Sequence, residues 1–314
     1  MKSNEVWSLI SRTPALFALL ALLWGTSFVA IEIGLVFFPP VLFAAIRYGS
    51  AGAIVLGYAV ATTDRALPRS RDDLLRVAAV GVFVIAGYHA LLYLGEQQVS
   101  GAVAAVVVSL SPVLTAAFAA PLFVEEHLDR LGVAGLVAGF LGVAVVADPE
   151  ATSLLSTGVG GLGLVLLGAA SFAAGSVLTR AFDAGMPLRA LEGWGMLLGG
   201  GLLWAVGVAR GESFAAIQWT GTAVLSLVYL TLLSGVVAFL VYFELLSRVG
   251  ATEINLVGYL EPVVATLMSW LLLGHLVATS TLAGFAVIFA GFALVKHRVV
   301  GRLLRSVATP RRHH

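Results

Sequence analysis

The chain has no cysteine, and only 11% of its 314 residues are charged. The missing cysteine excludes disulfides, thiolate zinc sites, iron–sulfur clusters and cysteine nucleophiles. The net charge of +1 leaves no basic or acidic excess for a nucleic-acid partner. Motifs for a metalloprotease, a serine hydrolase and an ATP-binding loop are also absent, so we expect no cofactor and no metal. What the sequence does have is apolar: 60% of its residues are hydrophobic, which predicts an integral membrane protein.

Apolar runs long enough to cross a bilayer recur along the whole chain. A spanning helix needs about 20 mostly apolar residues. The runs do not alternate in polarity, as the strands of a membrane barrel do. The sequence therefore predicts an all-α integral membrane protein with ten transmembrane helices. Their expected ranges are 15-36, 40-61, 74-95, 98-121, 131-147, 161-181, 190-209, 219-243, 254-274 and 279-296.

The basic residues predict how these helices are oriented. With the N-terminus in the cytoplasm, only Arg210 of the 18 Lys and Arg residues falls outside, while Arg47 lies within a span. Cytoplasmic loops of membrane proteins carry an excess of Lys and Arg. We therefore expect a multi-pass protein of the cell membrane with both termini in the cytoplasm.

The two halves of the chain repeat. A shift of 150 residues superposes Pro112 on Pro262, and shifts of 149 and 144 residues superpose further pairs in sequence order. Chance similarity among apolar segments is the alternative, but three ordered pairings favour a repeat. Because five helices per half is an odd number, residues 1-150 and 151-314 are expected to be inverted repeats. The further pairs are Gly135, Phe140 and Gly142 with Gly284, Phe289 and Gly291, and Ser27 and Phe28 with Ser171 and Phe172.

Two of the few ionisable residues within the spans flank the first turn. A charge at the centre of a bilayer costs about 2.5 to 3.5 kcal/mol on insertion scales, so such residues are candidates for function. The helical rise puts Glu32 and Arg47 at similar depths on an antiparallel hairpin. They are expected to form an ion pair, which either gates the outer entrance or only neutralises two charges.

Two further polar residues precede prolines at repeat-related places. Ser111 precedes Pro112 in the fourth span, and Glu261 precedes Pro262 in the ninth. Proline removes a backbone donor, so both helices are expected to kink and to present polar groups to a cavity. Ser111 and Glu261 are thus candidate substrate ligands. The alternative is two ordinary kinks and a glutamate bonded to a neighbouring helix.

A histidine and several aromatic residues also lie inside spans. His89 follows Tyr88, a pair that suits binding of a carboxylate or an amine, or transfer of a proton. A histidine that is satisfied by packing fits the sequence equally well. The aromatic residues expected to line the substrate cavity are Trp24, Phe28, Phe172, Phe239 and Tyr259.

Several stretches resemble the ten-helix EamA-type permeases of the drug/metabolite transporter superfamily. The resemblance implies an inner-membrane exporter of amino acids, metabolites or toxic compounds, with a cavity between its halves. One departure is His275, where the family often has glutamate. The stretches that carry the resemblance are residues 23–28 (LWGTSF), 45–48 (AIRY), 110–113 (LSPV) with Glu125, 248–251 (RVGA), 259–263 (YLEPV) and 273–275 (LGH).

Together these features predict a secondary transporter, expected to export a small amphipathic metabolite such as an amino acid by alternating access. A uniporter that needs no ion is an open alternative. A membrane-embedded enzyme is disfavoured because the polar groups are scattered, and a scaffold subunit would need neither repeat-related prolines nor polar residues at mid-depth. The expected partners are a small-molecule substrate and the lipid bilayer, and the oligomeric state is open, a monomer included.

The orientation gives a first testable prediction. Reporter tags fused to either terminus should both be found in the cytoplasm, and a label attached near residues 148–158 should react from outside. Reactivity of tags in intact and permeabilised cells measures this. A C-terminus facing outward would contradict the even number of spans.

Overall fold

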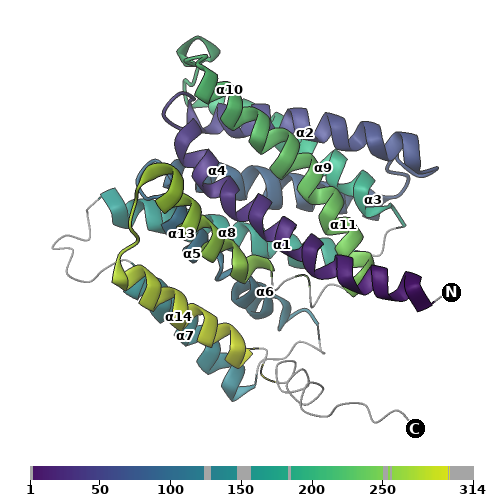
Figure 1. Cartoon of the computed structure of the whole chain (residues 1–314). Helices are drawn as coiled ribbons and strands as arrows, with labels where there is room; N and C mark the ends of the chain where they lie inside the picture. Colours follow the sequence, from purple (N-terminus) through teal and green to yellow (C-terminus); the bar gives the residue numbers. More distant parts are fainter. Residues whose placement is uncertain are drawn as a thin grey trace, which may run out of the picture.

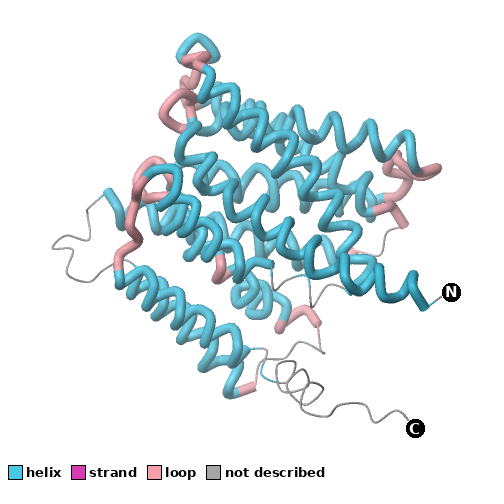
Figure 2. The backbone as a smooth tube through the Cα atoms, in the orientation of Figure 1, coloured by secondary structure: helices cyan, strands magenta, loops and turns pink. Residues whose placement is uncertain are grey.

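The computed structural model describes residues 3–123, 129–146, 157–182, 185–249, 254, 257–295 and 297, and in this part of the chain helices joined by loops are present and no strand is (Figure 2). The prediction of an all-α protein with ten apolar helical spans is confirmed. Seven spans are long enough to cross a membrane, and three are shorter apolar helices. The spans in chain order (Figure 1) are α1 (Ser3–Gly34), α2 (Pro40–Thr62), α3 with η1 and α4 (Arg71–Ala79, Val80–Gly87, Tyr88–Gly95), α5 with α6 (Gly101–Val108, Ser111–Ala119), α7 (Arg130–Val146), α8 (Thr157–Ala181), α9 (Leu188–Ala209), α10 with η4 and α11 (Gly221–Val228, Tyr229–Val237, Ala238–Val249), α13 (Val257–Leu273) and α14 (Thr279–Val295).

Close glycine contacts join α7 to α14, the fifth and tenth spans (Figure 1). A Cβ added at Gly142 would lie 2.8 Å from the carbonyl oxygen of Gly284. One added at Gly291 would lie 2.6 Å from the carbonyl oxygen of Gly135. These pairings make the two helices antiparallel, with their backbones in direct contact as small residues allow in membranes.

The same glycines show how the halves are related. The 149-residue shift relates Gly135 to Gly284, and Gly142 to Gly291. Exchanging the two halves therefore maps the α7–α14 interface onto itself. An interface of this kind lies on a two-fold axis, which is the relation that an inverted repeat requires.

Several other helix contacts follow the same two-fold relation. Glycines also bring α2 against α9, because an added Cβ at Gly52 would lie 2.8 Å from the Leu197 nitrogen and one at Gly200 would lie 2.7 Å from the Gly49 nitrogen. In the first half, α1 packs on α13 and on the α10–η4–α11 span; in the second half, α8 packs on α5 and α6 and on the α3–η1–α4 span. The contacts of α1 with α13 and with the eighth span thus correspond to those of α8 with the fourth and third spans.

Two segments of wide π-helix lie at repeat-related positions. They are η1 in the third span and η4 in the eighth, about 150 residues apart. The apolar pattern of these spans did not indicate a change of helix type. A π-turn adds a residue to the helical turn and rotates the side chains that follow it, and such turns are common at functional sites. Here η1 leads into Tyr88 and His89, while η4 carries Ser234.

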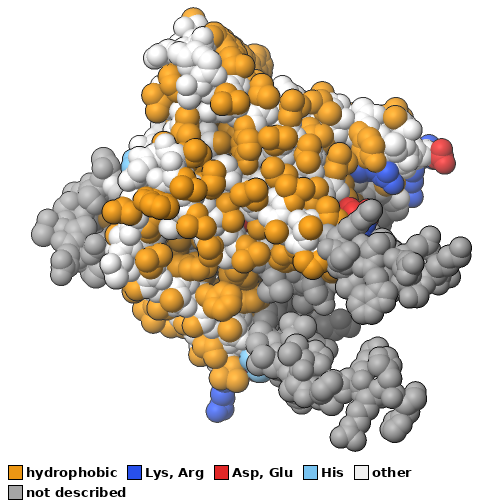
Figure 3. Space-filling model, viewed as in Figure 1, with side chains coloured by type: hydrophobic (Ala, Val, Ile, Leu, Met, Phe, Trp, Pro, Cys, Tyr) orange, Lys and Arg blue, Asp and Glu red, His pale blue; other side chains and the backbone are white. Residues whose placement is uncertain are grey.

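The lateral surface is apolar. Figure 3 shows hydrophobic side chains covering the face formed by α1, α10, α11 and α13, with the charged side chains that are visible gathered near its edges. Large apolar side chains such as Leu167 on α8 and Leu225 on α10 are more than half exposed. A bilayer accounts for this exposure.

The two ends of the bundle are named after the orientation predicted from the charges. The outer end carries residues 35–39, 96–100, 210–220 and 274–278. The opposite end is the inner end.

The glycine contacts generate a stability prediction. Gly142→Ala should lower the free energy of unfolding by about 1 to 3 kcal/mol, because the added methyl group overlaps backbone atoms of α14. The melting temperature should fall accordingly. Scanning fluorimetry of the purified protein in detergent measures the change.

The matched control is Gly163→Ala. Gly163 is also helical, but an added Cβ there would meet no atom within 4 Å. This variant should melt at or slightly above the wild-type temperature. Equal effects at the two positions would contradict the close approach of α7 and α14.

Candidate substrate site

Arg47 is buried at the centre of the bundle, 4% exposed. Its guanidinium donates hydrogen bonds of 3.0 Å to the Tyr93 hydroxyl on α4 and 3.0 Å to the Ser234 hydroxyl on η4. The Cζ atom lies 4.7 Å from the centre of the Tyr48 ring. Arg47 therefore joins the two halves, since Tyr93 belongs to the first and Ser234 to the second. We call Arg47, Tyr48, Tyr88, His89, Tyr93 and Ser234 the central cluster.

His89 is held by protein groups on both ring nitrogens. Nδ1 bonds the Ile85 carbonyl, so it carries the hydrogen, and Nε2 bonds the Tyr48 hydroxyl. A neutral imidazole satisfies both contacts, with Nε2 as the acceptor. This arrangement corresponds to the packing alternative, in which His89 orients Tyr48 and has no nitrogen left for a substrate.

The expected ion pair between Glu32 and Arg47 is not formed in the described part of the chain, and that expectation is corrected. Glu32 instead accepts a hydrogen bond of 2.8 Å from the Gly101 amide at the start of α5. Its other oxygen lies 3.2 Å from Nδ1 of His275, in the connection between α13 and α14. Similar depth in the membrane did not bring the two side chains together, because they point toward different helices.

Further contacts join segments at the outer end. The Leu42 amide donates to Glu212 at 2.9 Å, and the Gln218 amide donates to the Phe37 carbonyl at 3.0 Å. We call these two bonds, together with the two contacts of Glu32, the outer cap. The outer cap links α1, α2, α5, the connection between α9 and α10, and the connection between α13 and α14. Both halves are therefore tied together at this end.

Trp24 lies between α1 and the eighth span. Its ring centroid is 5.5 Å from that of Phe239 and 5.6 Å from that of Tyr242, and its indole nitrogen lies 3.3 Å from the Ser234 carbonyl. Trp24 and Phe239 thus form an aromatic pair that contacts the central cluster at Ser234. Phe172 of α8 packs edge-on against Tyr88 of the cluster at 5.4 Å.

Tyr259 lies apart from these aromatic residues. Its ring packs on Phe292 of α14 at 4.4 Å and on Phe289 at 5.4 Å. Helical periodicity places positions 259 and 261 about 200° apart on α13, so Tyr259 and Glu261 lie on different faces. Phe28 is buried at 3% exposure, with its ring in the main hydrophobic core.

The two repeat-related prolines have different surroundings. Helix α5 ends at Val108, and α6 begins at Ser111, so the fourth span breaks directly before Pro112. Helix α13 continues through Pro262. The Ser111 hydroxyl donates to the Val108 carbonyl at 2.7 Å and is buried.

Glu261 is a partly exposed carboxylate without a hydrogen bond or ion pair to the described residues. Its backbone packs on α1 at Gly25, and its carboxylate interacts electrostatically with Tyr88 of the central cluster. The two groups therefore face the same region from opposite halves.

Two further carboxyl groups near this region, the buried Glu96 and the partly buried Glu192, were not among the candidates predicted from the sequence. Glu192, near the inner end of α9, interacts electrostatically with Tyr48, Tyr242 and Arg76. Glu96 directly follows α4 at the outer end and interacts with Glu32 and Arg47. The signal for Glu192 was available, because it lies within the predicted span 190-209. Glu96 lies one residue beyond a predicted span, so burial was not indicated.

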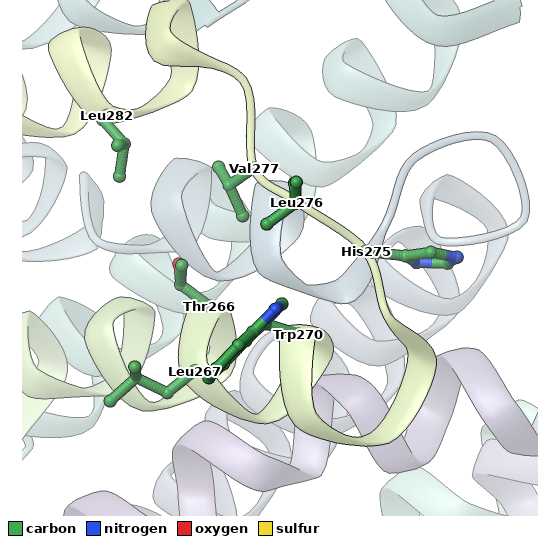
Figure 4. Close-up of a pocket in the computed structure, with 7 residues that line it drawn as sticks. All are labelled: Thr266, Leu267, Trp270, His275, Leu276, Val277 and Leu282. Carbon is green, nitrogen blue, oxygen red and sulfur yellow. The ribbon is translucent and has the colours of Figure 1, made fainter.

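Two grooves lie on the lateral surface, outside the central region. One, of about 230 Å³, lies between α13 and α14, and Figure 4 shows its lining residues, with the His275 side chain turned away from the rest. The other, of about 200 Å³, lies between the third span and α8. Trp270 and Leu282 in the first groove are more than half exposed, so this groove faces the lipid.

Comparison with known proteins gives the family. The profile of the EamA-like transporter family matches residues 12–147 and again residues 159–296, once in each half. The chain belongs to this family. Its EamA membership also confirms the resemblance noted from the sequence.

Relatives of this EamA protein have similar length and are described as transporters. An "uncharacterized transporter" of Archaeoglobus fulgidus is 26% identical, over 88% of this chain and 96% of its own. The "uncharacterized inner membrane transporter YedA" of Escherichia coli K12 is 30% identical, over 81% of this chain and 80% of its own. A crystal structure aligns over 93% of this chain and 99% of its own with a TM-score of 0.64, and its 23% identity shows the fold alone. This EamA protein is a membrane transporter.

The partners of Arg47 generate a prediction about coupling. Losses of unfolding free energy from Arg47→Met and Tyr93→Phe should be non-additive, by about 0.5 kcal/mol or more, because the two side chains share a buried hydrogen bond. Losses from Arg47→Met and Glu32→Gln should add to within about 0.5 kcal/mol, because the two residues share no hydrogen bond or ion pair in the described part of the chain. Double-mutant cycles of unfolding in detergent measure both couplings. A larger coupling of Arg47 with Glu32 than with Tyr93 would show that the charged residues meet.

Proposed function

We propose that this transporter exports small amphipathic metabolites that carry both a carboxylate and an amine, such as amino acids, by alternating access around the central cluster. The observation that carries the proposal is the buried Arg47 guanidinium, which has no carboxylate partner among the described residues. A lone cation within a membrane span is costly to bury. A substrate carboxylate would neutralise it.

The geometry around Arg47 supports this role. Its hydrogen-bond partners are neutral hydroxyls, and its Nε atom is buried without a partner. Arginine presents donors in a planar fork that matches a carboxylate. A bound carboxylate can take the place of the Ser234 hydroxyl while the bond to Tyr93 remains.

Glu261 supports the amine half of the proposal. It is a carboxylate from the second half without a hydrogen bond or ion pair to the described residues, and it interacts electrostatically with Tyr88, which also interacts with Arg47. Opposite charges that face one region suit a zwitterion. The alternative, in which Glu261 is bonded to a neighbouring helix, has no supporting bond in the described part of the chain.

Aromatic rings support an amphipathic substrate. Trp24, which packs on Phe239, contacts the central cluster at Ser234, and Phe172 contacts it at Tyr88. Ligand sites are mostly apolar, with a few polar groups that fix the orientation. An apolar side chain of the substrate can pack on these rings while its charged groups meet Arg47 and Glu261.

The two-fold relation of the halves supports alternating access. In inverted repeats, the two ends of the molecule can exchange open and closed arrangements around a midplane site. The outer cap supports a conformation that is closed at the outer end. The uniporter alternative shares this cycle, and the coupling ion does not affect the test that follows.

We expect phenylalanine to raise the melting temperature of the purified transporter more than either of two analogues with one charged group removed. Phenylalaninamide lacks the carboxylate, and 3-phenylpropionate lacks the amine. A ligand at one hundred times its Kd stabilises the folded state by about 2.7 kcal/mol. In a protein of this size that corresponds to a rise of about 5 °C. Scanning fluorimetry measures it.

Variants locate the effect. Arg47→Met should abolish the gain from phenylalanine, and Glu261→Gln should reduce it to the level of 3-phenylpropionate, while each variant without ligand still melts cooperatively. Leu167→Ala, on the lipid-facing side of α8, should keep the full gain. Equal stabilisation by all three compounds, or an undiminished gain in Arg47→Met, would contradict the proposed site.

A further inference from the structure

Glu96 is a buried carboxyl group that the proposed substrate site does not use. It is 5% exposed, and neither of its carboxylate oxygens has a hydrogen-bond partner in the described part of the chain. An ionised carboxylate without a partner is expensive to bury, and neutralisation by a proton removes most of that cost. The geometry therefore favours a protonated Glu96 in this conformation.

The helix ends give Glu96 and Glu32 opposite environments. Glu96 occupies the C-cap of α4, where the negative end of the helix dipole disfavours a carboxylate. Glu32 accepts a bond from the first amide of α5, where the positive end of the dipole favours one. Of these two neighbouring carboxyl groups, Glu96 is thus the one whose surroundings favour a bound proton.

The charged and titratable groups around Glu96 come from three elements. Glu32 of α1 and Arg47 of α2 interact with it electrostatically, without a hydrogen bond or ion pair, and so do Tyr88 and Tyr93 of α4. Burial and the Glu32 carboxylate raise the pKa of Glu96 well above its ordinary value, against the opposite effect of Arg47. His275 contacts Glu32 rather than Glu96.

We propose that Glu96 is a proton-binding site that keeps the outer cap closed while it is protonated. Glu32 holds the cap through Gly101 and His275, and an ionised Glu96 beside it would add like-charge repulsion and a desolvated charge. Opening the outer end hydrates Glu96 and removes both costs. The inference rests on the proposed alternating access and adds to it the proton as a ligand that selects the closed outer end.

The direction of the pH dependence follows from linkage. The closed state binds the proton more tightly than the hydrated open state, so acid favours closure. As the pH rises through the titration of Glu96 in the closed state, closure is lost. A difference of one bound proton changes the ratio of open to closed molecules by up to about tenfold per pH unit.

The natural absence of cysteine makes a direct test possible. We would introduce Thr231→Cys as the single thiol, because Thr231 is buried on η4, one turn toward the outer end from Ser234. The protein is reconstituted in liposomes and treated with a charged, impermeant methanethiosulfonate at external pH values from 5.5 to 8.5. Leu276→Cys, at an outer-end position that is 84% exposed, is the control. Its labelling rate at each pH measures the intrinsic reactivity of a thiol and the fraction of molecules whose outer end faces the reagent.

The ratio of the two labelling rates reports opening of the outer end. We expect this ratio to rise with pH, by up to about tenfold per unit, in the otherwise unchanged protein. With Glu96→Gln it should stay low and independent of pH, because glutamine imitates the protonated acid. With Glu96→Asp the pH dependence should return.

A flat ratio in the otherwise unchanged protein would overturn the proposal, even if the glutamine variant fails to fold. An unaltered pH dependence in Glu96→Gln would overturn it as well. The labelling assay uses no substrate, so its result is separate from that of the phenylalanine panel. A failed panel with a normal Glu96 titration would reject the proposed substrate class and keep the proton site.

Discussion

The polar centre of this protein depends on the burial of one positive charge. Arg47 enters the membrane on α2 without a carboxylate partner among the described residues, so neutral donors and acceptors from other helices have to surround it. Tyr93 and Ser234 supply hydroxyl oxygens, and Tyr48 supplies the face of its ring. Because these groups come from three spans and both halves, Arg47 fixes the register of the halves relative to each other.

The π-helical segments make this arrangement possible. Ser234 lies within η4, and the third span passes through η1 before it reaches Tyr88, His89 and Tyr93. A wide turn rotates the residues that follow it relative to a regular helix. His89 then orients Tyr48 beneath the guanidinium, so the neutral histidine contributes to the site indirectly.

The sequence predicted the features that lipid imposes and missed those that depend on side-chain direction. The ten spans follow from length and hydropathy, because a backbone in hydrocarbon has to satisfy its own hydrogen bonds. The repeat was readable from glycines such as Gly142 and Gly284, since only glycine permits that approach. The sequence also predicted the depth of Glu32 and Arg47 along their helices. It did not predict the direction of each side chain around the helix axis, and that direction decides which neighbour each residue meets.

The same limit explains the other differences at the site. Tyr259 and Glu261 are close in sequence, yet α13 directs them to different neighbours. His275 departs from the family pattern, and its partner Glu32 lies 243 residues away in the chain, beyond any local pattern. Glu125, which the 150-residue shift superposes on His275, lies outside the described residues. The domain boundary between residues 150 and 151 stays a prediction, although the family profile matches once on either side of it.

The backbone of the two halves is symmetric, but the side chains at the outer and inner ends differ. In the proposed alternating-access cycle, the two-fold relation makes the outer-closed and inner-closed arrangements similar in backbone packing, so side chains decide which one prevails. A ratio of 99 to 1 between two states needs only about 2.7 kcal/mol. The three hydrogen bonds of the outer cap, made by Glu32, Glu212 and Gln218, supply about 1 kcal/mol each. In that proposed cycle, a few polar contacts at one end are therefore enough to hold an otherwise symmetric transporter closed there, and the single proton proposed for Glu96 would be enough to change the ratio of closed to open molecules.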